Sequence, residues 1–85
     1  MNAWFIYLLK CRDNTLYTGI TTDLDARVRA HNAGKGAKYT RGRIPVKVVW
    51  TQKVSTQSEA LIQEAQIKKL SREQKKELIK QKKGI

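Results

Sequence analysis

Two tyrosines ten positions apart, Tyr7 and Tyr17, are the first residues of this chain whose type and spacing suggest chemistry. Each lies in a run of aromatic and branched residues that is typical of a β-strand, and residues 12–15 between the runs favour a turn. Arg27 and His31 follow at helical spacing. Phenol and imidazole groups can move protons, and a guanidinium can hold a phosphate. We therefore interpret these four residues as a candidate site for phosphodiester chemistry.

The two tyrosines can share a site only if the hairpin places them on one face of a sheet. Cross-strand partners share a face and faces alternate along a strand, so the paired residue numbers must then sum to an even value. A two-residue turn at Asp13 and Asn14 would pair Lys10 with Tyr17 and separate the tyrosines. A three-residue turn, a five-residue loop or a bulge would bring them together. Otherwise each tyrosine is simply a packing residue.

Arg27 and His31 lie on the same side of the predicted helix as Leu24 and Val28. Arg27 there either grips a phosphate through two parallel hydrogen bonds or extends past the apolar stripe to solvent. His31 is the only histidine, and its ordinary pKa near ~6.5 suits proton transfer. A structural histidine with satisfied hydrogen bonds is the alternative.

Glu64 is a carboxylate on an otherwise apolar helix face, between Leu61 and Ile67. A buried and unpaired carboxylate is costly, so Glu64 needs a cationic partner. Arg27 or a hard divalent cation such as Mg²⁺ would serve, since Mg²⁺ needs only one or two carboxylates in addition to water and phosphate oxygens. An internal salt bridge without a metal is the alternative.

The elements that must position these residues can be read from hydrophobic patterns and capping signals. The order β-β-α-β-α-α predicts an α+β fold, in which a three-stranded antiparallel sheet is flanked by helices. We expect one domain over residues 1–85, with a core over about 4–70 and a basic C-terminal helix over about 71–83. The predicted elements are strands over 4–10, 16–21 and 46–51, a helix that starts at Thr22 or Asp23, a possible short helix near 37–41, a helix over 59–70 capped by Ser58, and a last helix opened by a capping box at 71–74.

The charge of the chain favours a polyanionic partner. Eighteen Lys and Arg residues oppose seven Asp and Glu, which gives a net charge of +11. Nucleic acid is the expected partner for such a field, ahead of an acidic membrane surface or an acidic protein. The candidate nucleic-acid contacts are Lys10, Lys35, Lys38, Tyr39, Arg41 and Arg43.

Several other classes of protein do not fit this sequence. No apolar run approaches the ~20 residues of a membrane span, and the run from Trp4 to Leu9 lacks the flanks of a signal peptide. We expect a cytoplasmic protein. The single cysteine, Cys11, excludes an intrachain disulfide, and together with a single histidine it excludes a structural zinc site.

Taken in order, these residues resemble the GIY-YIG nuclease domain, most closely its small stand-alone bacterial members. The resemblance rests on Ile6-Tyr7, Tyr17-Thr18-Gly19, Leu24-x-x-Arg27-x-x-x-His31 and Ala60-x-x-x-Glu64-x-x-Ile67, and it runs from about Trp4 to Leu70. Phe5 stands where the family name has glycine, and Thr18 where it has isoleucine.

The resemblance implies a metal-dependent endonuclease that hydrolyses DNA phosphodiester bonds, in DNA repair or processing. It implies that Tyr7 and Tyr17 are paired active-site tyrosines, that Arg27 contacts the scissile phosphate, and that Glu64 binds a single divalent ion, Mg²⁺ or Mn²⁺. His31 lies near the site, and Tyr39 is similar to a tyrosine that often lines it. No small-molecule cofactor is expected, and the sequence leaves the oligomeric state open.

In the expected mechanism Tyr17 takes the proton of the attacking water, while Tyr7 orients the water or shares the role of base. Phenols lose protons reluctantly at neutral pH, so we expect the positive charges of Arg27, Lys10 and the metal to assist. His31 is expected to polarise a tyrosine or to contact phosphate. The rival interpretation is a non-catalytic nucleic-acid-binding module that retains the fold.

Overall fold

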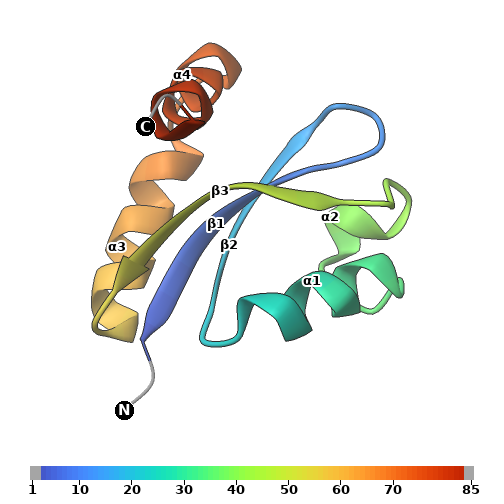
Figure 1. The fold of residues 1–85 in the computed structure, drawn as a ribbon, viewed down its shortest axis with the longest axis horizontal. Helices are drawn as coiled ribbons and strands as arrows, with labels where there is room; N and C mark the ends of the chain where they lie inside the picture. The colour runs from blue at the N-terminus through green and yellow to red at the C-terminus, as the bar shows by residue number, and fades with distance from the viewer. Residues whose placement is uncertain (1–2, 84–85) are drawn as a thin grey trace.

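The computed structural model describes residues 3–83 of the 85-residue chain and has the predicted α+β architecture. Its elements are β1 (Trp4–Lys10), β2 (Leu16–Thr21), α1 (Leu24–Asn32), α2 (Lys38–Arg41), β3 (Lys47–Val54), α3 (Gln57–Lys68) and α4 (Arg72–Lys83). The short helix that the sequence left as a possibility is α2. The three strands form an antiparallel sheet in the order β2-β1-β3, so β1 is the central strand (Figure 1).

Each face of the sheet carries its own apolar cluster. On one face Ile6 and Leu8 of β1 pack with Ala60 and Ile67 of α3, and Leu78 of α4 adds to them. On the other face the alternate residues of β1 pack against α1 and the segment before β3; this cluster contains Tyr7, Leu9, Tyr17, Leu24, Val28 and Ile44. Helices α3 and α4 therefore cover one face and α1 with α2 the other (Figure 1).

The hairpin register brings the two tyrosines to one face. Leu9 pairs with Tyr17 and Lys10 pairs with Leu16, so each pair sums to 26 and the connecting loop is residues 11–15. This is the five-residue loop among the odd-length connections that the shared site requires. Asn14 allows the loop to turn because it adopts a positive φ of 69°, which asparagine tolerates better than most residues.

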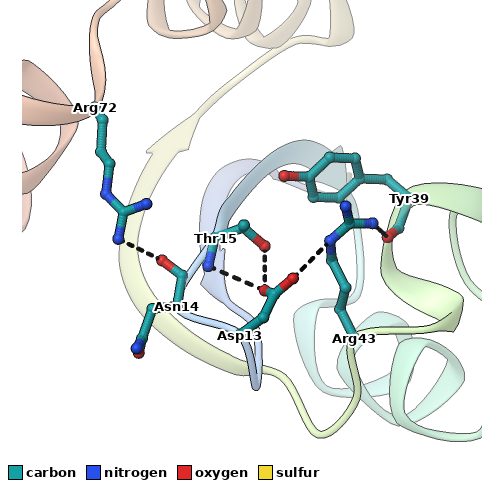
Figure 2. A network of polar contacts seen from close by, with 6 residues as sticks. All are labelled: Asp13, Asn14, Thr15, Tyr39, Arg43 and Arg72. Atoms are coloured by element: carbon teal, nitrogen blue, oxygen red, sulfur yellow. Dashed lines mark hydrogen bonds and ion pairs between the residues drawn. The ribbon is translucent and has the colours of Figure 1, made fainter.

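Polar contacts within the loop and across it fix its shape. The Asp13 carboxylate accepts hydrogen bonds from the backbone N–H of Thr15 at 3.1 Å and from its hydroxyl at 2.6 Å. Arg43 binds Asp13 at 3.0 Å from the α1 and α2 side, and Arg72 donates to the carbonyl of Asn14 at 3.0 Å from α4 (Figure 2). The loop is thus held by an arginine from each face of the sheet.

Two element boundaries differ from the prediction. The N-cap of α3 is Thr56 rather than Ser58: its hydroxyl accepts from the backbone N–H of Glu59 and donates to the Glu59 carboxylate. The helix therefore begins at Gln57, two residues earlier than predicted. Strand β3 continues to Val54 because it stays paired with β1 as far as Trp4, and Val54 is buried there. Asp23 is the N-cap of α1, one of the two predicted residues.

The connection between α1 and β3 is anchored by Asn32, the last residue of α1. Its side chain accepts from the N–H of Val46 at 2.7 Å and donates to the Val46 carbonyl at 3.1 Å. This clamp closes the segment that carries α2, which therefore lies against α1. In residues 3–83 no helix is long and apolar enough to cross a membrane.

Candidate active site

The hydroxyl of Tyr7 lies at the centre of the site, on the central strand. The side chain is 1% exposed, and its oxygen is 3.2 Å from Nε2 of His31. Gly19, the cross-strand partner of Tyr7, leaves room for this ring: a Cβ at position 19 would lie 2.5 Å from the hydroxyl oxygen. Gly19 is therefore required because Tyr7 approaches the backbone of β2 closely at this position.

His31 is fully buried and hydrogen-bonded through both ring nitrogens. Its Nδ1 lies 2.7 Å from the hydroxyl of Thr40, which itself donates to the carbonyl of Ala37 at 2.9 Å. Because the Thr40 hydroxyl already donates its hydrogen to Ala37, it must accept from Nδ1–H of His31. In a neutral imidazole Nε2 is then the acceptor, so the Tyr7 hydroxyl donates to it. The chain of donors runs from Tyr7 to His31 to Thr40 to Ala37.

Burial favours the neutral forms of Tyr7 and His31. Desolvation raises the pKa of Tyr7 above its ordinary value, the Arg27 guanidinium opposes that shift, and the charges of Tyr17 and Glu64 add to it. Burial also lowers the pKa of His31, and the nearby charge of Arg27 lowers it further. At neutral pH the site therefore contains a phenol and an imidazole, with Arg27 as the nearby cation.

Tyr17 links this buried pair to the surface through an aromatic stack. Its ring centroid is 6.3 Å from that of Tyr7 and 5.3 Å from that of His31. Its other neighbour is Tyr39, stacked at 5.8 Å, and the guanidinium of Arg43 lies 4.3 Å from the Tyr39 centroid. Tyr39 is 41% exposed, so the stack reaches solvent at this end.

Glu64 is close enough for its charge to act on Tyr7, but its cationic partner differs from the expected one. The carboxylate pairs with Lys68 of the same helix at 3.6 Å, rather than with Arg27, and its side chain is 18% exposed. The i,i+4 spacing on α3 makes Lys68 the nearest cation along the helix. Lys68 is itself 56% exposed, and such pairs are worth only about 0.3–0.5 kcal/mol, so Glu64 remains available to a stronger cation.

The donor set of the site fits a single hard cation. No group of three or more His, Cys, Asp and Glu side chains that could hold a metal occurs in residues 3–83. A lone, largely buried carboxylate suits Mg²⁺, which takes the remainder of its ligands from water and phosphate oxygens. Glu64 is the residue that would hold such an ion.

The predicted nucleic-acid contacts fall on two faces of the molecule. Lys35, Lys38 and Arg41 are exposed in α2 and the loop before it, near Tyr39. Lys10 points to the opposite face of the sheet from Tyr17, because it pairs with Leu16 rather than with Tyr17. The expectation that Lys10 assists Tyr17 is therefore corrected by the register.

Sequence reasoning missed two residues of this site. Thr40 lies between the predicted contacts Tyr39 and Arg41, and nothing in its type or spacing indicates that it binds His31. Gly36 lies so close to the His31 ring that a Cβ there would collide with Nδ1 and the backbone. A glycine in a polar loop was the only available signal, and it also fits an ordinary turn.

A comparison with protein families assigns the chain to a known domain. Residues 3–77 match the model of the GIY-YIG catalytic domain, which is most of the chain. The chain belongs to the GIY-YIG family. That family comprises nuclease domains, which act on nucleic acid.

Two relatives of similar length are about half identical to this chain in sequence. A UPF0213 protein of Staphylococcus haemolyticus is 50% identical over 81 residues, 95% of this chain and 99% of the relative. A UPF0213 protein of Haloquadratum walsbyi is 53% identical over 74 residues, 87% of this chain and 83% of the relative. These names state no activity.

Two solved structures have the same fold. The solution NMR structure of a UPF0213 protein from Bacillus halodurans is 45% identical, with a TM-score of 0.62 over 94% of this chain and 85% of the other. The NMR structure of a protein from E. faecalis is 42% identical, with a TM-score of 0.65 over 95% and 86% of the two chains.

Proposed function

We propose that this GIY-YIG protein is a metal-dependent endonuclease that hydrolyses DNA phosphodiester bonds in the cytoplasm, in DNA repair or processing. The observation that carries the proposal is the buried hydrogen-bond chain from Tyr7 through His31 to Thr40, beside Tyr17 and Arg27. A buried phenol and a buried imidazole need hydrogen-bond partners in any protein. Here the tautomer that Thr40 fixes also gives the Tyr7 hydroxyl an acceptor to which its hydrogen can pass.

The hydrogen bonds from Tyr7 to His31 and from His31 to Thr40 allow Tyr7 to remove a proton without becoming a phenolate. Its hydrogen is donated to His31 Nε2 and Arg27 donates to one of its lone pairs, so the other lone pair can accept from a water molecule. As the water oxygen bonds to phosphorus, one of its O–H bonds breaks and the proton passes to Tyr7. The bond from phosphorus to the leaving oxygen breaks at the same time, and that oxygen keeps the electron pair and takes a proton from solvent. The hydrogen already on Tyr7 moves to Nε2, which leaves a neutral tyrosine and an imidazolium. The carbonyl of Ala37 and the hydroxyl of Thr40 hold the ring in place during this transfer.

This scheme moves the role of base from Tyr17, the sequence-based expectation, to Tyr7. Tyr17 packs against His31 and Tyr39, so we assign it to orienting the water or the phosphate. Arg27 binds the scissile phosphate through its planar guanidinium. A divalent ion held by Glu64 would supply Lewis-acid stabilisation of the charge that grows on the phosphate and on the leaving oxygen.

The proposal is tested by a cleavage panel on labelled duplex, nicked, branched and single-stranded DNA, and on RNA. Each substrate is incubated with Mg²⁺, with Mn²⁺ or with chelator. We expect cleavage only with a metal, and we expect Arg27→Ala and Glu64→Ala each to lower its rate by at least about 10²-fold, as for other groups that stabilise transition-state charge.

Two matched controls keep this test specific. Arg29→Ala removes an exposed arginine from the same helix as Arg27, and Glu77→Ala removes an exposed glutamate from α4. Both should cleave like the wild type. Undiminished cleavage by Arg27→Ala and Glu64→Ala would refute their roles. DNA binding without metal-dependent cleavage of any substrate would favour the non-catalytic binding module.

A further inference from the structure

A basic cavity lies on the face of the sheet that the tyrosines do not use. It has a volume of about 450 Å³ and lies between the hairpin end of the sheet and α4. Its apolar lining consists of Leu16, Val49 and Ile79. Its charged lining consists of four cations, which are Lys10, Lys47, Arg72 and Lys76.

The four cations form two adjacent pairs of like charge, which repel each other. Lys10 and Lys47 are direct cross-strand partners, and like charges directly opposite each other destabilise a sheet. Arg72 and Lys76 are four residues apart on α4, where like charges also repel. No acidic residue lines the cavity within residues 3–83. The one ion pair near it joins Lys76 to Glu73 at 3.8 Å, and Glu73 is 84% exposed.

The guanidinium of Arg72 is held in place without losing its charge. One of its nitrogens donates to the carbonyl of Asn14 at 3.0 Å, which fixes the side chain against the hairpin loop (Figure 2). A neutral carbonyl does not cancel the charge, and the remaining N–H groups stay available to an anion.

The cavity cannot hold the phosphate that is cut. Lys10 and Leu16 face away from Leu9 and Tyr17, so the sheet itself separates the cavity from the tyrosine site. We propose that this cavity binds a backbone phosphate of the nucleic acid at a distance from the cleaved bond. The proposal rests on the proposed function only in taking nucleic acid as the ligand; it requires no catalysis.

The test measures binding of fluorescently labelled duplex and branched DNA in chelator, where no cleavage interferes. The variant is Lys10→Gln combined with Lys47→Gln, which removes a repulsive pair, so the fold should be as stable as in the wild type or more stable. We expect its affinity to fall by about tenfold or more at low salt. The slope of log K against log salt concentration should fall by about 1, as loss of one phosphate contact predicts.

The control combines Lys69→Gln with Lys80→Gln, which removes the same charge from exposed positions outside the cavity. It should lose much less affinity than the cavity variant. Equal losses in the two double variants, or an unchanged salt slope, would overturn the proposal, because the effect would then be one of net charge.

The two proposals fail in different ways. If the cavity variant binds DNA normally while Arg27→Ala abolishes metal-dependent cleavage, the cavity proposal is wrong and the nuclease proposal stands. If the wild type never cleaves but the cavity variant still loses affinity, only the nuclease proposal fails. A wild type that binds no DNA at low salt overturns both.

Discussion

The hydrogen that Thr40 gives to Ala37 determines which nitrogen of His31 faces Tyr7 as an acceptor. Two buried side chains are thereby oriented by a residue that is itself fully buried. Thr40 is a positioning residue, because it acts through His31. The orientation holds only while His31 is neutral, since an imidazolium has no acceptor nitrogen. The charge state of one ring therefore controls the hydroxyl of Tyr7.

A pH-dependent stability follows from the burial of His31. Its pKa is lowered by folding, so the unfolded chain binds a proton more readily than the folded chain does. The resulting contribution to the free energy of unfolding is present above pH 6.5 and is lost as the pH falls toward the lowered pKa of the folded state. Urea unfolding from about pH 8 to about pH 5 measures it.

The control for this prediction is His31→Gln, which removes the titrating group and keeps a polar side chain. The variant should be less stable at pH 8 and should show a smaller decline between pH 8 and pH 5. A wild type and a variant with parallel pH profiles would contradict the assignment to His31. The Tyr7 pKa, which is raised, becomes relevant only in strongly alkaline solution.

At the scale of elements, β2 contains a polar residue in an apolar environment. Thr18 is 4% exposed, pairs with Leu8, and has a hydroxyl with no hydrogen-bond partner in the described part of the chain. It stands where the family name has isoleucine. A buried hydroxyl without a partner costs about 1–3 kcal/mol, whereas valine has nearly the same shape and suits a strand.

We therefore expect Thr18→Val to raise the free energy of unfolding by about 1 kcal/mol, measured by urea denaturation. Metal-dependent cleavage should not change, because Thr18 faces away from the tyrosine site. Thr15→Val is the contrasting control: its hydroxyl donates to Asp13 at 2.6 Å, so this variant should lose stability. A destabilised Thr18→Val would mean that the hydroxyl has a partner after all.

The elements were predictable where a local signal was strong. Asp23 as N-cap, the capping box at Ser71 and Gln74, and the order of strands and helices follow from short-range patterns. The parity of the hairpin is a condition for a shared site, and turn residues alone do not determine the loop length that satisfies it. Ser58 is the predicted cap because it resembles Thr56 in type and lies only two residues further along the chain.

The candidate site was predictable only in part, for a different reason. Tyr7, Tyr17 and His31 are brought together by the register and by α1, as their spacing suggested. The contact between His31 and Thr40 depends on how the segment between α1 and β3 folds back. No periodic pattern encodes that segment. Lys10 failed as a neighbour of Tyr17 because it is three positions from Tyr7 on β1, so the register that joins the tyrosines places it on the opposite face.

At the scale of the whole molecule, the net charge of +11 governs how nucleic acid is captured. Exposed lysines and arginines contact phosphates without reading bases, so we expect binding that is weakly selective for sequence. Affinity should fall steeply with salt, by about 10³-fold between about 50 and about 200 mM if six or more phosphates are contacted. Fluorescence anisotropy on unrelated sequences of equal length measures both properties. A salt-independent affinity would exclude this mode of capture.

The central place of β1 has a consequence for how the site is lost. Its backbone is hydrogen-bonded to β2 on one side and to β3 on the other. Tyr7 therefore cannot leave its position while either neighbouring strand remains in register. The amide hydrogens of β1 should exchange with solvent only when the entire chain unfolds. In rising denaturant, the displacement of Tyr7 should therefore coincide with global unfolding, whereas Arg27, His31 and Thr40 lie outside the sheet, on α1 and α2.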